Sequence, residues 1–183
     1  VLLVAKVLSH FPVNVLILMN DEEEGPVDKG NSMFSRANMR LFHRTPTELL
    51  PELVISVDGH QQEQALEAGR ATNFKQGALF SGMTSMARGA VTPPRLIGFQ
   101  RALSAKLAEH GISLVENKEG ISRSDDVSSM FYTQNIVHVG YPAAYSHFDR
   151  KPFGYVSDMV HLARTLVIYA LIAQNPGWRG TDL

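Results

Sequence analysis

The chain has 183 residues, 44% of them hydrophobic and 19% charged. That length suits one domain with a substantial core and is too short for two domains of ordinary size. The 17 Lys and Arg residues nearly balance the 18 Asp and Glu residues, and the net charge of −1 argues against a nucleic-acid binder, which needs clustered positive charge. The chain has no cysteine, which excludes disulfides, thiolate metal sites and a cysteine nucleophile.

The amino-terminal half begins with residues 1–10, which read as the end of a helix. Val13–Met19 is a nearly continuous aliphatic run, which predicts a strand covered on both faces. A short helix is expected around Ser32–Phe42, a second strand at Leu53–Val57, and a further strand at Ala78–Phe80. Strands and helices therefore alternate from the start.

The carboxyl-terminal half continues this alternation. Pro94 opens a helix with an apolar stripe that Gly111 closes, and a last helix starts near Ser157–Asp158 and stops at Asn175. Between them we expect two strands and one short helix: Ile112–Val115, Ile136–Val139 and the helix Val127–Tyr132. The pattern predicts a single domain over residues 1–183 of the α/β class, with three layers (α/β/α) and a mostly parallel, mixed central sheet.

No run reaches the roughly 18 apolar residues that a membrane span needs. The longest uncharged apolar stretch, Leu166–Ala173, fits a buried helix. We therefore expect neither a membrane nor a nucleic acid among the partners.

Groups that can bind a metal follow three of the predicted strands. Glu22, Glu23 and Glu24 follow the strand Val13–Met19, Asp58 ends the strand that begins at Leu53, and His147 lies in the loop after Ile136–Val139. Ligands of open α/β sheets bind beyond the carboxyl ends of the strands, where these loops meet. Carboxylate and imidazole donors suit zinc, cobalt or manganese.

Each of these groups also has a simpler interpretation. Adjacent carboxylates repel one another unless a cation neutralises them, but residues 22–24 would also suit a solvated acidic turn. Asp58 could make an Asx turn and His147 could be a surface histidine. His60 could reach the same site or point away from it, whereas His138 is expected to be a hydrogen-bonded core residue.

Other catalytic motifs are absent from the sequence. There is no G-x-S-x-G nucleophile elbow, no phosphate-binding P-loop and no G-x-G-x-x-G fingerprint. The sequence therefore gives no basis for a serine hydrolase or a nucleotide-binding enzyme.

Five short motifs occur in an informative order. They are Glu22-Glu23-Glu24-Gly25, Val54-Ile55-Ser56-Val57-Asp58, Ser124-Asp125-Asp126, Gly140-Tyr141-Pro142 and Tyr145-Ser146-His147. In this order they resemble the catalytic domain of the dinuclear zinc aminopeptidases, which include bacterial leucyl, glutamyl and deblocking aminopeptidases. The resemblance implies a zinc-peptidase-like fold and a hydrolase that removes amino-terminal residues from peptides.

The resemblance also implies roles for individual residues. Glu22 would be the general base, and Glu23, Asp58 and His147 would be metal ligands. A register shifted by one, with Glu23 and Glu24 in the first two roles, fits the motif as well. Two Zn²⁺ ions are implied for the intact enzyme, with Co²⁺ or Mn²⁺ as substitutes, and a peptide as substrate.

One departure from the family pattern limits these expectations. The family supplies a histidine ligand and a bridging aspartate from a region before the Glu-Glu strand, and we expect this sequence to begin too late to contain either. We therefore expect the chain to be the carboxyl-terminal portion of a metallopeptidase catalytic domain, weakly metallated and inactive by itself.

Two other functions stay open on the sequence alone. One is a non-catalytic, peptidase-like domain for binding or dimerisation, and the other is a related zinc carboxypeptidase or amidohydrolase. A homo-oligomer is compatible with the sequence, and the lack of cysteine and of an export signal favours a cytoplasmic location.

Overall fold

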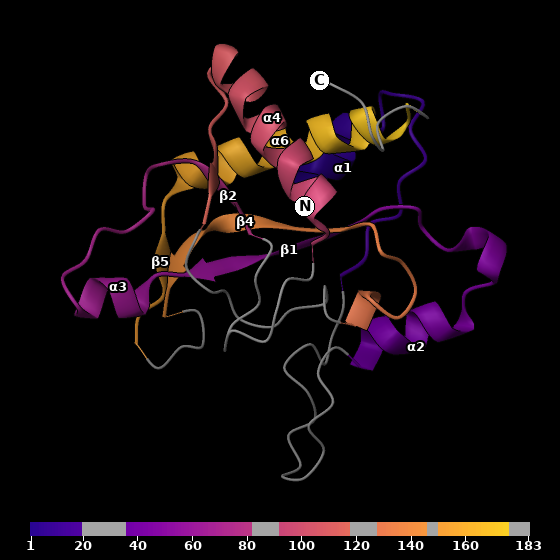
Figure 1. Cartoon of the computed structure of the whole chain (residues 1–183), viewed down its shortest axis with the longest axis horizontal. Coiled ribbons are helices and arrows are strands. Elements are labelled where there is room, and N and C mark those ends of the chain that lie inside the picture. The colour runs from indigo at the N-terminus through magenta and orange to yellow at the C-terminus, as the bar shows by residue number, and fades with distance from the viewer. Residues whose placement is uncertain (20–35, 82–91, 118–127, 146–149, 176–183) are drawn as a thin grey trace, which may run out of the picture.

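The computed structural model describes residues 1–19, 36–81, 92–117, 128–145 and 150–175. A mixed β-sheet lies at the centre, and helices lie on both sides of it (Figure 1). The predicted α/β class is confirmed.

The sheet has five strands in the order β1-β4-β2-β3, with β5 also paired to β4. β1 and β4 are parallel, as are β2 and β3, whereas β2 and β5 each run antiparallel to β4. The longest pairing is the parallel pair β1–β4, in which Asp58 is the register partner of Gly140. The strands are β1 (Val54–Gln61), β2 (Ala78–Ser81), β3 (Leu114–Glu116), β4 (Ile136–Ala144) and β5 (Phe153–Gly154).

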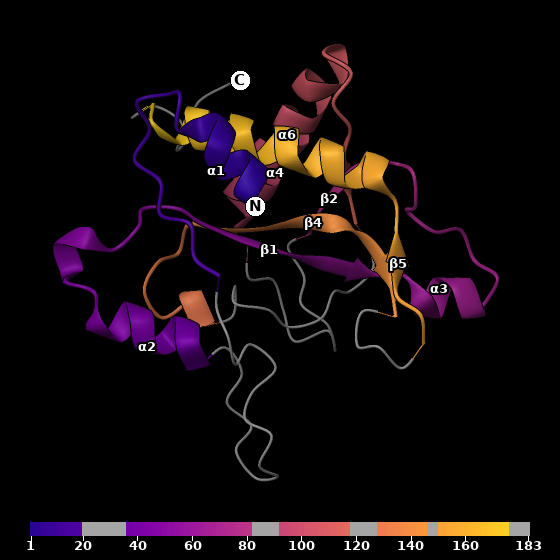
Figure 2. The same cartoon turned by 180° about the vertical axis from the view of Figure 1, so that it is seen from behind.

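The helices divide between the two faces of the sheet. On one face lie α1 (Leu2–Leu8), α4 (Pro94–Glu109) and α6 (Val156–Ala173). On the other side are α2 (Arg36–Arg44) and α3 (Glu63–Glu67), at opposite ends of the sheet (Figure 2). A 3₁₀ turn at Thr47–Leu49 leads from α2 towards β1.

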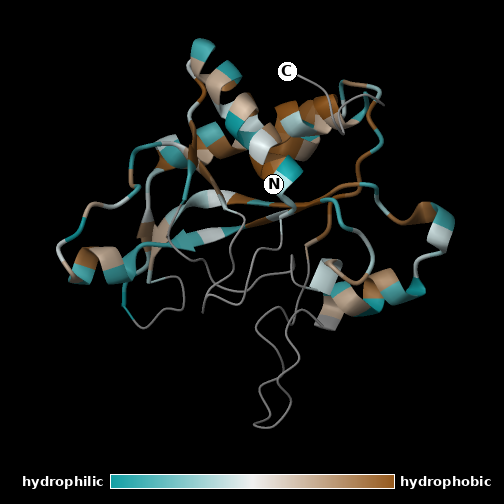
Figure 3. Cartoon of the chain, in the orientation of Figure 1, coloured by the Kyte–Doolittle hydropathy of each residue, from teal (hydrophilic) through white to brown (hydrophobic). Residues whose placement is uncertain are grey.

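The hydrophobic core fills the space between the sheet and α1, α4 and α6. Side chains of a strand alternate between its two faces, so Val137 and Val139 of β4 point to the same side as Phe80 of β2. They pack against aliphatic side chains of α4 and α6 such as Leu103 and Leu166. In Figure 3 the hydrophobic colour gathers in this layer, whereas the carboxyl half of β1 is hydrophilic.

The predicted strand at Val13–Met19 is wrong. The residues are described without strand pairing and most are exposed, Leu16 and Met19 by 73% and 75%. A strand requires a neighbour with which to exchange hydrogen bonds, and the described part of the chain does not provide one beside this segment.

Strand boundaries differ from the prediction by more than one residue in β1, β3 and β4. β1 and β4 continue beyond the expected ends, through Asp58 to Gln61 and through Gly140 to Ala144. The polar residues that suggested a strand end are tolerated because the two strands pair with each other over this length. β3 begins later than expected, at Leu114.

The predicted helices are largely confirmed. α4 and α6 begin and end within a few residues of the expected positions, and Gly111 closes α4 in the left-handed region at φ +69°. By length and composition α6 could cross a membrane. In the structure it packs on β2, β4 and α1, and Leu162, Tyr169 and Ala170 are buried there.

Candidate functional site

The face of the sheet opposite α4 and α6 carries a row of polar side chains. Ser56, Asp58 and His60 of β1 share this face because strand side chains alternate. His138 of β4 is the register partner of both Ser56 and Ser81, which brings three strands into the same row. We call Ser56, Asp58, His60, Ser81 and His138 the polar face.

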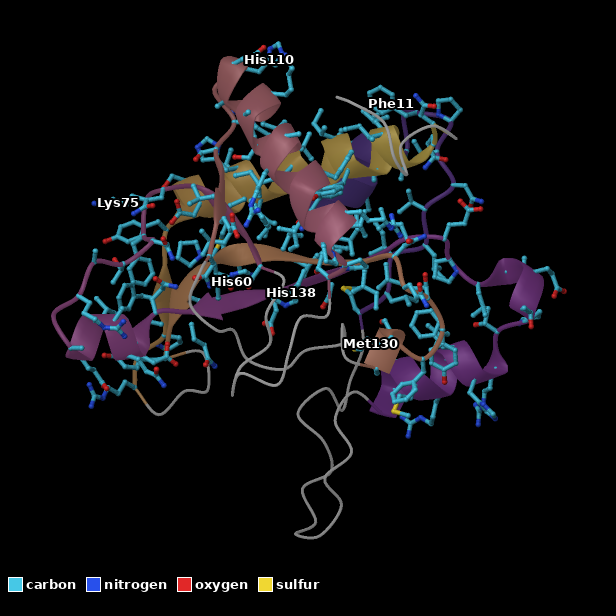
Figure 4. All side chains as sticks on the ribbon, viewed as in Figure 1. Phe11, His60, Lys75, His110, Met130 and His138 are labelled. Atoms are coloured by element: carbon cyan, nitrogen blue, oxygen red, sulfur yellow. The ribbon has the colours of Figure 1, made fainter. Side chains whose placement is uncertain are left out.

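Two buried histidines lie at the centre of the polar face. The rings of His60 and His138 stack with centroids 4.9 Å apart and planes inclined by 26°. Both side chains are almost fully buried, with 0% and 2% of their surface exposed. Figure 4 shows the two labelled side chains close together beside the sheet, away from α4.

A series of hydrogen-bonded amide side chains orients His60. Nδ2 of Asn117 lies 3.1 Å from Nδ1 of His60, so an amide donor there leaves the ring proton on Nε2. Asn73 donates from Nδ2 to Oδ1 of Asn117 at 3.5 Å, and its backbone N–H donates to Oε1 of Gln62 at 2.9 Å. The segment before β2 is therefore tied to the polar face.

The remaining ring nitrogens have no hydrogen-bond partner among the described residues. These are Nε2 of His60 and both nitrogens of His138. The expectation of a hydrogen-bonded His138 is thus not met, because the residues that face it on β1 and β2 leave it stacked on another ring.

Burial keeps both imidazoles neutral. Desolvation lowers the pKa of His60 well below its ordinary value, and the nearby His138 lowers it further. Burial alone lowers the pKa of His138 to about 4. A charged imidazole here would need a counter-ion, so at neutral pH both rings act only as neutral donors or acceptors.

Gly140 makes the close approach of β1 and β4 possible beside Asp58. A Cβ at this position would overlap the carbonyl oxygen of Asp58 and would lie 2.8 Å from Cδ2 of His60. Only glycine fits without a backbone shift, so Gly140 sets the spacing between Asp58 and the histidine pair.

Asp58 lies within β1 rather than behind it, which corrects the predicted strand end. Its side chain is half-buried, and its Oδ1 accepts the N–H of Gly59 at 2.6 Å. The strand continues for three more residues to Gln61. The carboxylate thus faces the polar row, and its oxygen donors are of the kind that zinc accepts.

Asp58 is the one predicted site residue that the structure describes. Glu22, Glu23 and His147, together with Glu24 of the shifted register, lie outside the described residues. Within residues 1–19, 36–81, 92–117, 128–145 and 150–175, no group of three His, Asp or Glu side chains could hold a metal ion. The described residues therefore supply one donor of the expected set and do not complete a metal centre.

Sequence reasoning missed the histidine pair. His60 and His138 are separated by 78 positions, and each was weighed alone. A signal was present: Ser56, Asp58 and His60 alternate with the non-polar residues Val57 and Gly59, and this period of two predicts one polar face if the strand continues beyond Val57.

No family model matches the chain, and no curated protein matches it in sequence. Solved structures do match in fold. An aminopeptidase, APDkam598 from the archaeon Desulfurococcus kamchatkensis, aligns with a TM-score of 0.60 and 13% identity, over 81% of this chain and 41% of its own. PhTET1-12s, solved as a dodecamer, aligns with a TM-score of 0.54 and 12% identity, over 74% of this chain and 37% of its own.

This chain thus spans about 40% of the length of the structures it matches. At 12–13% identity the likeness establishes the fold, not the reaction. The α/β architecture of this chain is that of the matched part of these two structures.

Proposed function

We propose that the protein is a metal-dependent peptidase that removes residues from the amino terminus of peptides. One observation carries the proposal: a fold shared with the structure of an archaeal aminopeptidase places a half-buried carboxylate, Asp58, on the polar face of its sheet. The five motifs that resemble zinc aminopeptidases also occur in order along the sequence.

The proposed donors come from three parts of the chain. Glu23, Asp58 and His147 would bind zinc, and Glu22 would be the general base. β1 and β4 are adjacent and parallel, so Asp58 and Ala144, which lies three residues before His147 in the sequence, belong to neighbouring strands. Bound zinc supplies a Lewis acid and an acidified water.

Residues of the chain would transfer the proton and support the site. A carboxylate at position 22 would accept a proton and return it to the leaving amine, as general acid–base catalysis requires. Gly140 keeps Asp58 close to β4, and the buried histidine pair holds the adjoining part of β1 in place. Since the described residues do not complete a metal centre, we assign no order of steps.

The direct test measures zinc binding and peptide cleavage separately. We expect Asp58→Asn and His147→Ala to lower zinc binding at least about tenfold, the usual scale for removing or weakening one ligand. Glu22→Gln should retain zinc and lose turnover of an aminoacyl p-nitroanilide by a factor of about 10² or more. Titration calorimetry and a chromogenic assay on the protein at its full natural length provide the two measurements.

A blocked substrate supplies the control for the reaction type. Acetylation of the substrate's amino group should abolish cleavage by an aminopeptidase, whereas a carboxypeptidase or amidohydrolase would still act on blocked substrates. If Asp58→Asn and Glu22→Gln both leave zinc binding and turnover unchanged, the proposed site is wrong.

A further inference from the structure

A hollow of about 790 Å³ lies along the outer edge of β1. Residues 54–57 of β1 and residues 14–18 both line it. Side chains of α1 and α6 line the hollow on the helix side of the sheet, and side chains of α2 line it on the other side. The hollow therefore lies in the plane of the sheet, between the two helical layers.

On the side of this hollow, no described strand pairs with the backbone of Ile55 and Val57. The N–H groups of Val54 and Gln62 donate towards β4, to Asn135 and Ala143. In a parallel ladder alternate residues bond to the same neighbour, so the N–H and C=O groups of Ile55 and Val57 point away from β4. β1 is an edge strand in the described sheet, and such an edge can accept a further strand.

Residues 14–18 have the composition of a strand, but they pair with no described strand. Asn14 is tied to α6 through its N–H, which donates to Oε1 of Gln174 at 3.0 Å. Beyond it, Val15, Leu16 and Leu18 expose 41%, 73% and 38% of their surface. Aliphatic residues thus line the hollow while remaining accessible to water.

We propose that this hollow is the docking groove for one extended, aliphatic peptide strand that is not part of residues 1–183. The strand would hydrogen-bond to Ile55 and Val57 and lie against residues 14–18, extending the sheet by β-strand addition. The proposal concerns an interaction surface and is independent of the proposed peptidase activity.

The lining defines the chemistry of the occupant. Towards the helices the groove presents aliphatic side chains of the buried core: Val4, Leu8, Leu166 and Ala170. Towards α2 it presents Leu41 and Phe42, so a strand here would be covered on both faces and should be aliphatic throughout. Among the described lining residues, the charged side chains are the acidic Glu48 and Glu52, both just before β1, and none is Lys or Arg. This favours a basic residue at the end of the docked strand that lies nearest the start of β1.

The test uses a synthetic peptide and the backbone amides of β1. The probe is acetyl-Lys-Lys-Val-Ile-Val-Ile-Val-Lys-Lys-amide, and the control peptide carries proline in place of the central valine. We expect the probe to slow hydrogen exchange at the amides of Ile55 and Val57 by about tenfold or more, as measured by NMR. Exchange at Ser56, whose amide faces β4, should not change.

Two variants separate docking from folding. Val57→Pro removes an amide that no strand uses in the described sheet, so the protein should fold while protection by the probe is lost. Leu16→Glu changes an exposed lining residue and should weaken binding without affecting β1. The amide of Ser56 reports whether each variant is folded.

Two results would overturn the proposal. The first is equal protection by the probe and by the proline control, or no protection by either. The second is protection of Ile55 and Val57 without any peptide that grows with protein concentration, since a second copy of the chain would then occupy the groove.

Discussion

The two faces of the central sheet carry different kinds of buried side chain. The face towards α4 and α6 carries Phe80, Val137 and Val139, packed into a continuous aliphatic core. The other face, on the same strands, carries His60 and His138, whose three unpartnered ring nitrogens are buried among the described residues. Burial of apolar groups stabilises the fold, whereas burial of unpaired polar groups costs free energy.

This difference indicates where the sheet is adapted for purposes other than stability. A sheet selected only for stability would place aliphatic side chains on both covered faces. The polar face keeps Asp58 and the histidine pair at a cost, which is the pattern expected at functional sites. Substitutions on the two faces should therefore have different consequences.

The largest effect is expected at Gly140, where the two strands of the polar face approach most closely. Gly140→Ala places a methyl group on the carbonyl oxygen of Asp58, so the free energy of unfolding should fall by more than about 4 kcal/mol. Urea denaturation measures it. The matched control is Gly98→Ala in α4, where a Cβ meets no atom within 4 Å and should stabilise the helix by about 0.5–1 kcal/mol.

Neighbouring residues of β2 allow a direct comparison of the two faces. Phe80→Ala on the aliphatic face should cost about 3–5 kcal/mol because it leaves a cavity in the core. Ser81→Ala on the polar face should cost about 1 kcal/mol. Equal losses in denaturant titrations would show that the faces do not differ in the way described.

Asp158 is a buried charged residue on the aliphatic side of the sheet, and hydrogen bonds satisfy its carboxylate. Its carboxylate is fully buried and accepts the N–H groups of Lys75 and Gly77, each at 2.9 Å. Asp158→Asn replaces one acceptor with a donor, so the unfolding free energy should fall by about 2–3 kcal/mol. Glu109→Gln, which removes one partner of an exposed ion pair with Lys106, is the control and should change it by less than about 0.5 kcal/mol.

The sequence predicted the fold better than the site. Hydrophobic periodicity located α4 and α6, and aliphatic runs located β1, β2 and β4, because these elements bury one face against the core. The same reasoning failed at Val13–Met19, since strand formation depends on a neighbouring strand and not on local composition alone.

The sequence did not predict which side chains of different strands come into contact. His60 and His138 meet only because the register of β1 with β4 and of β4 with β2 sets them on one face. A shift of one residue would turn either ring to the other side. Residue types alone do not fix that register, so Asp58 was anticipated and the histidine pair was not.

The smallest effect is expected from pH acting through His138. Burial lowers its pKa to about 4, whereas in the unfolded chain it titrates near 6.5. Between these values the unfolded state binds more protons than the folded state. The contribution of His138 to the free energy of unfolding is therefore fully present above about pH 6.5, decreases as the pH falls and is lost below about 4. The loss is about 1.4 kcal/mol per pH unit, or about 2 kcal/mol between pH 6.5 and 5.

His138→Phe isolates this contribution because phenylalanine keeps an aromatic ring against His60 and cannot titrate. Denaturant titrations at pH 7, 6 and 5 in the presence of a chelator should show a shallower fall in stability for His138→Phe than for the unaltered chain. His43→Gln, at an exposed position of α2, provides the matched control. An unchanged slope in His138→Phe would mean that the ring takes up a proton in the folded state as readily as in the unfolded one, and the polar face would then be open to water.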